Sequence, residues 1–310
     1  MLPSVLLFPG QGSQRVGMGR RLASEHRAAR LAFEEADDAL GMRLSRLCFE
    51  GPQDELVRTE NAQPAILATS IAGYRAAAEA VGLRPSWLAG HSLGEYSALV
   101  VAGALRFPDA LRLVRLRGRL MQSAVPEGVG AMAAVIGLTD DALAEVCARA
   151  SAGDEIVDPA NFNGAGQIAI AGHRAAVDRA VAAARARGAR TVGLAVSAPF
   201  HCRLMAPAAE GLGRALDGIE IGTLALPVVA NVDAAPNMDA RRVRRLLVDQ
   251  VTAPVRWAQS MAALAELGCV RAFEIGPGQV LTRLVQRMRL GIEASAAGEG
   301  EGWAALASVA

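Results

Sequence analysis

The chain is poor in cysteine and carries almost no net charge, and both absences narrow what it can be. Its four cysteines lie far apart and form no CxxC pair, which indicates neither a disulfide scaffold nor a zinc site. A net charge of +1 gives no overall field that would attract nucleic acid or a membrane surface. No stretch approaches the ~20 apolar residues that cross a bilayer, and no basic leader opens the sequence. We therefore expect a cytoplasmic protein that binds neither nucleic acid nor membranes and holds no metal.

Aromatic residues are also scarce, at 4% of the 310 residues, although 52% are hydrophobic. The core must therefore consist mainly of Ala, Leu and Val, which suits helices packed on a sheet. Short apolar runs followed by glycine-rich loops and helical stretches recur, as in SWLAGHSLGEYSALVVAGAL. This alternation predicts an α/β fold, with a mostly parallel sheet covered on both faces and functional loops at the carboxyl ends of its strands.

The middle of the chain has a different pattern. GAMAAVIGL, QIAIAG and RTVGLAV are predicted strands, separated by one helix capped by Thr139 and a second helix that ends at Gly188. This β-α-β-α-β stretch predicts a small insert with its own sheet over residues 127–196. Residues 1–126 and 197–310 would then form one large discontinuous domain.

The segment GHSLGEY places Ser92 between two glycines, after a predicted strand and before a predicted helix. A serine in G-x-S-x-G at such a turn is typical of a nucleophile, because nearby backbone amides and the helix dipole can stabilise an oxyanion. The alternative is a plain turn in which Ser92 caps the helix. The pattern alone leaves both interpretations open.

A serine nucleophile needs a base, and the sequence offers four histidines. His91 is adjacent to the serine and should point to the opposite face, His26 lies in a polar helical run, and His173 stands at a helix start. His201 follows a strand and a proline turn, where a loop can carry it over the sheet edge. Elimination therefore selects His201 as the base candidate, with a structural histidine as the alternative.

Arg117 lies in the predicted helix DALRLVRLRGRLMQ. At 100° per residue it falls on the apolar side of that helix, opposite the cluster formed by the helix's other arginines, Arg112, Arg115 and Arg119. Burying an unpaired guanidinium is costly, so Arg117 needs an anionic partner. That partner is either a ligand carboxylate, which suits the fork geometry of Arg, or an internal Asp or Glu.

Several segments together resemble the malonyl-CoA:acyl carrier protein transacylase family over nearly the whole chain. They are FPGQGSQ at Phe8–Gln14, NAQPAIL at Asn61–Leu67, GHSLGEY at Gly90–Tyr96, the helix around Arg117, NFNGAGQIAIAG from Asn161, SAPFHCRLM around His201, QVTAPVRW from Gln250 and EIGPGQVLTRL from Glu274. The combination of GHSLGEY with FPGQGSQ makes the resemblance specific. It implies an α/β-hydrolase-like large domain with a small ferredoxin-like insert, and an active site in the cleft between them.

The resemblance also implies a reaction without a cofactor. Ser92 would take the malonyl group from malonyl-CoA as an ester and pass it to the phosphopantetheine thiol of an acyl carrier protein, in a ping-pong mechanism. His201 would be the base, oriented by a main-chain carbonyl at the position that Gln250 matches.

The remaining roles are likewise implied by the resemblance. The backbone amides of Gln11 and Leu93 would form the oxyanion hole, and Arg117 would hold the free malonyl carboxylate. Phe200 stands where some members have Ser, and in related polyketide acyltransferases a Phe there accompanies malonyl preference. Asn161 matches a family motif and is expected to shape the pocket.

Other functions remain open at this stage. The same serine and histidine could pass the acyl group to water, as in a thioester hydrolase, although an ordinary esterase has no use for a buried arginine. A free-standing acyltransferase that serves a polyketide synthase would have the same residues as one in fatty acid synthesis. A non-catalytic carrier-binding module is disfavoured by the intact set of Ser92, His201 and Arg117.

A monomer is expected, with a basic surface for docking because carrier proteins are usually acidic. Two arginine runs are candidates, and each is equally well explained as an ordinary solvated face: Arg241–Arg245, and Arg283 with Arg287 and Arg289.

Overall fold

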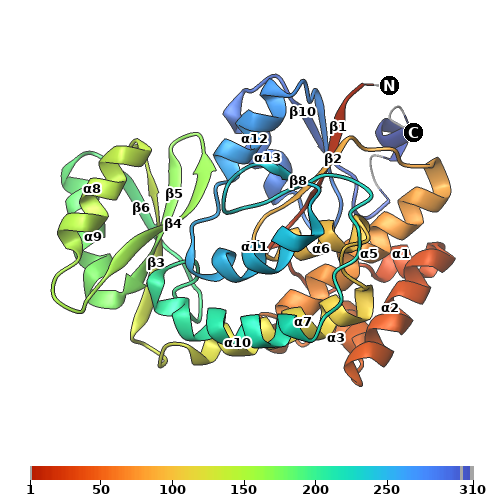
Figure 1. Cartoon of the computed structure of the whole chain (residues 1–310), viewed down its shortest axis with the longest axis horizontal. Helices are drawn as coiled ribbons and strands as arrows, with labels where there is room; N and C mark the ends of the chain where they lie inside the picture. The colour runs from red at the N-terminus through yellow and green to blue at the C-terminus, as the bar shows by residue number, and fades with distance from the viewer. Residues whose placement is uncertain (1, 301–302, 308–310) are drawn as a thin grey trace.

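The computed structural model describes residues 2–300 and 303–307, which form two β-sheets (Figure 1). The larger sheet has the strand order β10-β9-β1-β2-β7-β8. Its strands are β1 Ser4–Phe8, β2 Trp87–Gly90, β7 Val228–Val229, β8 Pro236–Asn237, β9 Arg271–Glu274 and β10 Glu293–Ala296. The strands from β10 to β7 pair in parallel, and β8 pairs antiparallel with β7. The prediction of an α/β fold with a mostly parallel sheet is confirmed.

Helices cover both faces of this sheet, because alternate residues of its strands enter different cores. Leu6 and Phe8 of β1 lie in the larger core, whereas Val5 and Leu7 lie in a second core on the opposite face. The second core includes side chains of α12 and α13. The helices around the large sheet are α1 Arg20–Glu25, α2 Arg27–Leu40, α3 Leu44–Glu50, α4 Gln53–Leu56, α5 Thr59–Val81, α6 Leu93–Val101, α7 Phe107–Ser123, η1 Arg203–Met205 (a 3₁₀ turn), α10 Ala206–Asp217, α11 Ala240–Thr252, α12 Trp257–Glu266, α13 Val280–Met288 and α14 Trp303–Leu306.

The second sheet is antiparallel and has the order β4-β5-β3-β6. Its elements are β3 Gly130–Ile136, α8 Asp140–Ala150, β4 Val157–Gly164, β5 Gln167–His173, α9 Arg174–Ala186 and β6 Arg190–Gly193. Figure 1 shows this unit at one end of the molecule, with α8 and α9 packed together on it. It has a hydrophobic core of its own, and Thr139 caps α8 by accepting from Ala142 N–H at 3.3 Å.

Two details of the predicted β-α-β-α-β stretch were wrong. The structure adds the strand β4, and the last strand ends at Gly193 rather than at Val196. Residues with low strand propensity, such as Pro159 and Gly164, concealed β4 in the sequence. The pairing of β4 with β5 is also interrupted by two register shifts, which obscure any alternation of apolar and polar residues.

Glycines allow the backbones around the Ser92 turn to approach closely. An added Cβ at Gly90 would lie 1.9 Å from the carbonyl carbon of Gly94, and one at Gly94 would lie 1.9 Å from the oxygen of Phe8. Both obstacles are backbone atoms, which cannot move aside as a side chain can. The two glycines of G-x-S-x-G are therefore required by contact between β1, β2 and the start of α6.

Replacing Gly94 by Ala should destabilise the protein by about 1–3 kcal/mol or more, because the new methyl group overlaps the β1 backbone. Gly213→Ala, within α10, is the matched control. Its added Cβ would lie 3.6 Å from Val248, which is an ordinary van der Waals distance. That control should keep or slightly raise stability, as Ala favours helix by about 1 kcal/mol over Gly. Urea unfolding of both variants checks this, and equal midpoints would contradict it.

Candidate active site

The carboxyl ends of β1 and β2 meet, because Phe8 and Gly90 are partners in the parallel register. The loop after Phe8 and the turn after Gly90 therefore share one sheet edge, where they help to enclose a cavity of about 270 Å³. Most of the predicted site residues line this cavity: Gln11, Ser92, Leu93, Arg117, Asn161, Phe200 and His201. Gln250 is buried behind them and hydrogen-bonds to several. The structure thus brings together every residue that the sequence predicted for the site.

Ser92 occupies a strained turn at the start of α6, with φ 52° and ψ −106°. Asn231, which follows β7, braces both ends of that turn. Its Oδ1 accepts from Ser92 N–H at 2.6 Å, and its Nδ2 donates to the oxygen of Gly90 at 2.7 Å. The Ser92 side chain makes no capping hydrogen bond to α6. Ser92 thus occupies the N-cap position of α6, but its hydroxyl does not cap the helix.

The Ser92 hydroxyl contacts an oriented imidazole. Ser92 Oγ lies 2.7 Å from His201 Nε2, and His201 Nδ1 lies 2.9 Å from the main-chain oxygen of Gln250. A carbonyl oxygen can only accept, so Nδ1 carries the proton and Nε2 is left to accept the serine proton. A nucleophile, a base and a group that orients the base thus lie in series.

The electrostatic surroundings keep that imidazole neutral. Burial, followed by the positive charge of Arg117, lowers the pKa of His201 to about 3. An imidazole with a pKa well below its ordinary ~6.5 is unprotonated at neutral pH. His201 can therefore take up a proton from the serine hydroxyl.

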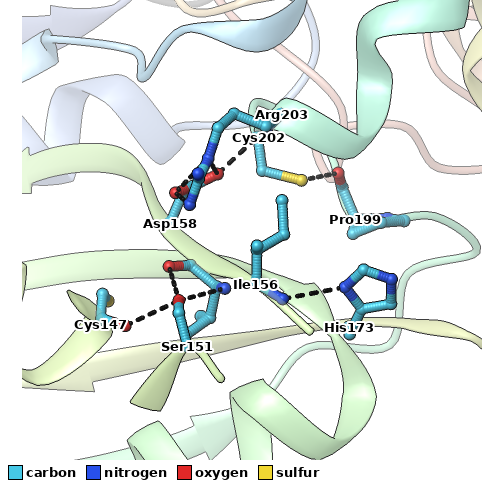
Figure 2. A network of polar contacts seen from close by, with 9 residues as sticks. Cys147, Ser151, Ile156, Asp158, His173, Pro199, Cys202 and Arg203 are labelled. Atoms are coloured by element: carbon cyan, nitrogen blue, oxygen red, sulfur yellow. Dashed lines mark hydrogen bonds and ion pairs between the residues drawn. The ribbon is translucent and has the colours of Figure 1, made fainter. Parts of the chain in front are cut away.

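The loop that carries His201 is fastened to the small sheet, as Figure 2 shows. Arg203 donates to the Asp158 carboxylate of β4 from Nη2 at 2.8 Å and from Nε and its backbone N–H at 3.1 Å. Within the loop, Cys202 Sγ donates to the oxygen of Pro199 at 3.0 Å. The ion pair is largely exposed and so adds at most about 1 kcal/mol of stability. Its effect is to fix where the His201 loop lies.

Arg117 is 2% exposed, and its hydrogen bonds go to neutral groups. Nη1 donates to Gln63 Oε1 at 2.8 Å, while Nη2 donates to Gln250 Oε1 at 2.9 Å and to Ser92 Oγ at 3.1 Å. Within residues 2–300 and 303–307, no carboxylate forms an ion pair with Arg117, and Nε has no hydrogen-bond partner. The alternative of an internal ion pair is therefore not found.

Close packing of two helices holds this arginine in place. A Cβ at Gly118 would lie 2.7 Å from the Cα of Glu60, so α7 approaches α5 closely and Gln63 of α5 can reach the guanidinium. The guanidinium carbon lies 5.4 Å from the centre of the Tyr96 ring, a favourable cation–π distance. Burial lowers the pKa of Arg117, but an arginine still remains charged.

Two backbone amides beside the serine are available as donors. The N–H groups of Gln11 and Leu93 have no acceptor among the residues that the structure describes. Leu93 is the first residue of α6, where the helix leaves such groups free and the helix dipole is positive. Gly10 brings the Gln11 loop close, since a Cβ there would lie 2.5 Å from the oxygen of His91.

Comparison with known proteins agrees with this geometry. Residues 5–295 match the family model of the acyl transferase domain. The chain belongs to the acyl transferase family. It is 47% identical to the malonyl CoA-acyl carrier protein transacylase of Escherichia coli strain K12 over 306 residues, 98% of this chain and 99% of that protein. It is 45% identical to the protein of the same name from Bacillus subtilis strain 168 over 296 residues, 95% of this chain and 93% of that one.

Solved structures of this acyl transferase family have the same fold. The acyl-carrier-protein-S-malonyltransferase of Bartonella henselae superposes with a TM-score of 0.96 at 45% identity, covering 99% of both chains. A malonyl-transacylase in complex with a type II PKS acyl-carrier protein superposes with a TM-score of 0.95 at 46% identity, again over 99% of both.

The other three histidines of this acyl transferase chain make contacts with groups other than the serine hydroxyl. His91 lines the cavity, but its Nε2 lies 3.0 Å from Asn163 Oδ1, and burial lowers its pKa. His173 Nδ1 accepts from the backbone N–H of Ile156 at 3.0 Å (Figure 2). His26 packs against Trp303. The structure thus supports the elimination that selected His201.

Sequence patterns missed three residues of the polar surroundings: Gln63, Glu95 and Asn231. Glu95 is 2% exposed, and burial raises its pKa to about 7. Its signal was a charged residue within the otherwise apolar helix LGEYSALVV. Asn231 follows the apolar run LPVVA, which placed it at a strand end. Gln63 lies within the NAQPAIL segment that carries the family resemblance, but as one of many buried residues on α5 it had no signal that pointed to its own role.

The described residues include no helix long and apolar enough to cross a membrane and no cluster of three or more potential metal ligands. All four cysteines are buried and unpaired.

The lowered pKa of His201 can be measured by NMR on protein with ¹³C-labelled histidines, with the signal assigned through His201→Ala. The imidazole should stay neutral down to about pH 5, because burial and the Arg117 charge disfavour its protonated form. Arg117→Ala should raise the pKa, and Arg119→Ala, which removes an exposed arginine of the same helix, should not. A midpoint near the ordinary histidine value in the unmodified protein would contradict this electrostatic account.

Proposed function

We propose that this chain transfers a malonyl group from malonyl-CoA to the phosphopantetheine thiol of an acyl carrier protein, through an ester on Ser92. One observation carries the proposal. The guanidinium of Arg117 is buried 3.1 Å from Ser92 Oγ and has no carboxylate partner within the described protein. An acyl group that ends in a carboxylate would supply that partner beside the nucleophile.

In the first half-reaction, His201 Nε2 removes the Ser92 hydroxyl proton while Oγ attacks the thioester carbonyl carbon. The amides of Leu93 and Gln11 donate to the oxyanion that forms. The carbon–sulfur bond then breaks, and the CoA sulfur leaves with the proton that His201 holds. In the second half-reaction the carrier thiol gives its proton to His201 and attacks the ester, and Ser92 regains its proton.

Arg117 would change partner during this cycle. Its Nη2 donates to Ser92 Oγ in the described structure, which stabilises negative charge on that oxygen. A malonyl carboxylate would take up the guanidinium donors, including the unpartnered Nε. Gln250 would link the two tasks, because its side chain holds Arg117 and its main chain orients His201.

The pocket lining supports a small acyl group. Phe200 is 9% exposed and lines the cavity, and Asn161 of β4 also lines it. We propose that the Phe200 ring restricts the space beside the malonyl methylene, and that Asn161 shapes the opposite wall. An ordinary thioester hydrolase would not require a cation at this point, so transfer is the better account.

The carrier protein could belong to either pathway. The identity to the Escherichia coli protein, 47%, is close to the 46% identity to the type II PKS malonyl-transacylase. We therefore propose the reaction without restricting it to fatty acid or polyketide carriers. A monomeric cytoplasmic enzyme without a cofactor stays a prediction.

We also propose the domain division 1–126 with 197–310, and 127–196. It is supported by the separate sheet and core of β3 to β6. The order β4-β5-β3-β6 with the succession β-α-β-β-α-β supports a ferredoxin-like insert. The strand-serine-helix turn of β2 and α6 supports an α/β-hydrolase-like large domain.

The arginines of α13 are the better candidates for carrier docking. Within Arg241–Arg245 the arginines are engaged by acidic neighbours or carbonyl oxygens. Arg283 and Arg287 are exposed one turn apart on α13, line a surface pocket and form no ion pair with any described residue. The helix packs against β4, which carries Asn161. We propose that they attract the acidic carrier to the mouth of the cavity.

Reversing both charges, Arg283→Glu with Arg287→Glu, should raise KM for an acidic carrier protein about tenfold or more, since like charges then oppose docking. The acylation of Ser92 by malonyl-CoA, monitored by the intact mass of the protein, should change little. The matched control is Arg241→Glu with Arg245→Glu. If the reaction with malonyl-CoA is weakened as much as the reaction with the carrier protein, this surface binds coenzyme A instead.

The function itself is tested with Arg117→Ala, measuring kcat/KM for malonyl-CoA and acetyl-CoA. The malonyl-to-acetyl preference should fall about 100-fold or more, because acetyl has no carboxylate and a charged hydrogen bond is worth about 1.5–3 kcal/mol. Arg119→Ala should keep the preference. A malonyl adduct in the intact mass of the parent protein, absent from Ser92→Ala, identifies the ester. An unchanged preference with a lower Tm would make Arg117 structural and favour a hydrolase.

A further inference from the structure

Glu95 is a buried acidic residue to which the proposed mechanism assigns no part. It lies in the first turn of α6, and one of its two carboxyl oxygens, Oε2, accepts two hydrogen bonds. The donors are the backbone N–H of Asn231 at 2.9 Å and the side-chain Nε2 of Gln250 at 2.8 Å. Both donors belong to residues that brace the active site, so Glu95 stands at the centre of that polar network.

The Gln250 amide can face its neighbours in two orientations that differ only in polarity. In the observed one, Nε2 points to Glu95 and also donates to Ser92 O at 3.1 Å, while Oε1 accepts from Arg117 at 2.9 Å. A reversed amide would set its NH₂ donors against the guanidinium donors and its oxygen against Glu95 Oε2 and Ser92 O. These contacts would be repulsive, so the acceptor on Glu95, together with Ser92 O, favours the orientation in which Oε1 meets Arg117.

We propose that Glu95 is a positioning residue that aims Gln250 Oε1 at Arg117 and thereby holds the guanidinium ready for the substrate carboxylate. This inference rests on the proposed malonyl transfer and adds the group that maintains its specificity. Glu95 does not touch the reacting atoms, and it acts through Gln250.

The role requires an acceptor at one point in space rather than a negative charge. Both hydrogen bonds use Oε2, so a proton on this carboxyl group would sit on Oε1 and leave the acceptor intact. A glutamine at position 95 would place a carbonyl oxygen at the same distance from the backbone. An aspartate would keep the charge but withdraw the acceptor by one methylene group.

Two variants therefore separate the position of the acceptor oxygen from the negative charge of residue 95. Each is measured by kcat/KM for malonyl-CoA and for acetyl-CoA. Glu95→Gln should keep the malonyl-to-acetyl ratio within about threefold, whereas Glu95→Asp should lower it about tenfold, as expected for losing one hydrogen bond near a charged group. Both variants retain a polar side chain in the buried network, and a thermal melt confirms that each is folded. A normal ratio in Glu95→Asp, or a tenfold loss in Glu95→Gln, overturns the proposal.

A double-mutant cycle tests whether the effect passes through Gln250. Gln250→Leu removes the side-chain amide but keeps the main-chain oxygen that orients His201. Adding Glu95→Asp to it should not lower the malonyl-to-acetyl ratio further, because the group that Glu95 positions is already gone. If the two substitutions together lower the ratio by the product of their separate effects, Glu95 acts independently of Gln250 and the proposal is overturned. The unmodified protein separates the two claims: without malonylation of Ser92 the proposed function itself fails, whereas malonylation with other results at Glu95 rejects this inference alone.

Discussion

A guanidinium buried without a carboxylate is the constraint on which the rest of the site depends. Removing such a charge from water is costly unless surrounding groups satisfy it. Here the partners are the neutral side chains of Gln63, Gln250 and Ser92, together with the face of Tyr96. These groups accept hydrogen bonds from Nη1 and Nη2, leave Nε without a partner, and carry no negative charge. The protein thus keeps a positive potential beside its nucleophile, and the positions of α5, α6, α7 and α11 all serve that purpose.

The backbone provides the geometry that side chains then use. Gly90 and Gly94 allow the nucleophile turn to contact β1, and Gly118 allows α7 to contact α5. Main-chain groups also act directly, since the Gln250 carbonyl orients His201. Such contacts are set to within tenths of an ångström by packing, which is why rigid strand ends and helix starts carry the site.

Much of the site could be predicted from the sequence, because its chemistry needs unusual residues in unusual places. Ser92 stood between two glycines, Arg117 lay on the apolar side of a helix, and His201 was left when the other histidines were excluded. Asn231, at the end of an apolar run, and Gln63, within NAQPAIL, lay in segments that the sequence singled out, but their roles in the site could not be assigned in this way. A buried amide needs hydrogen-bond partners as any polar group does, but here those partners come from segments distant in sequence, so no local pattern identifies its role. The strand β4 was missed for a related reason: pairing with β5 outweighs the poor strand propensity of its own residues.

If Arg117 pairs with a substrate carboxylate as proposed, its electrostatic coupling to His201 would make the rate of proton removal part of substrate choice. Burial first, and then the positive charge of Arg117, lower the pKa of His201 and make its imidazole a weak base. A malonyl carboxylate paired with Arg117, as proposed, would offset that charge, so the basicity of His201 would increase when an acidic acyl group is in place. A neutral acyl thioester could occupy the same cavity and still meet a base too weak to remove the serine proton quickly. Selection by such a site depends on the speed of proton removal as well as on how long each substrate stays bound.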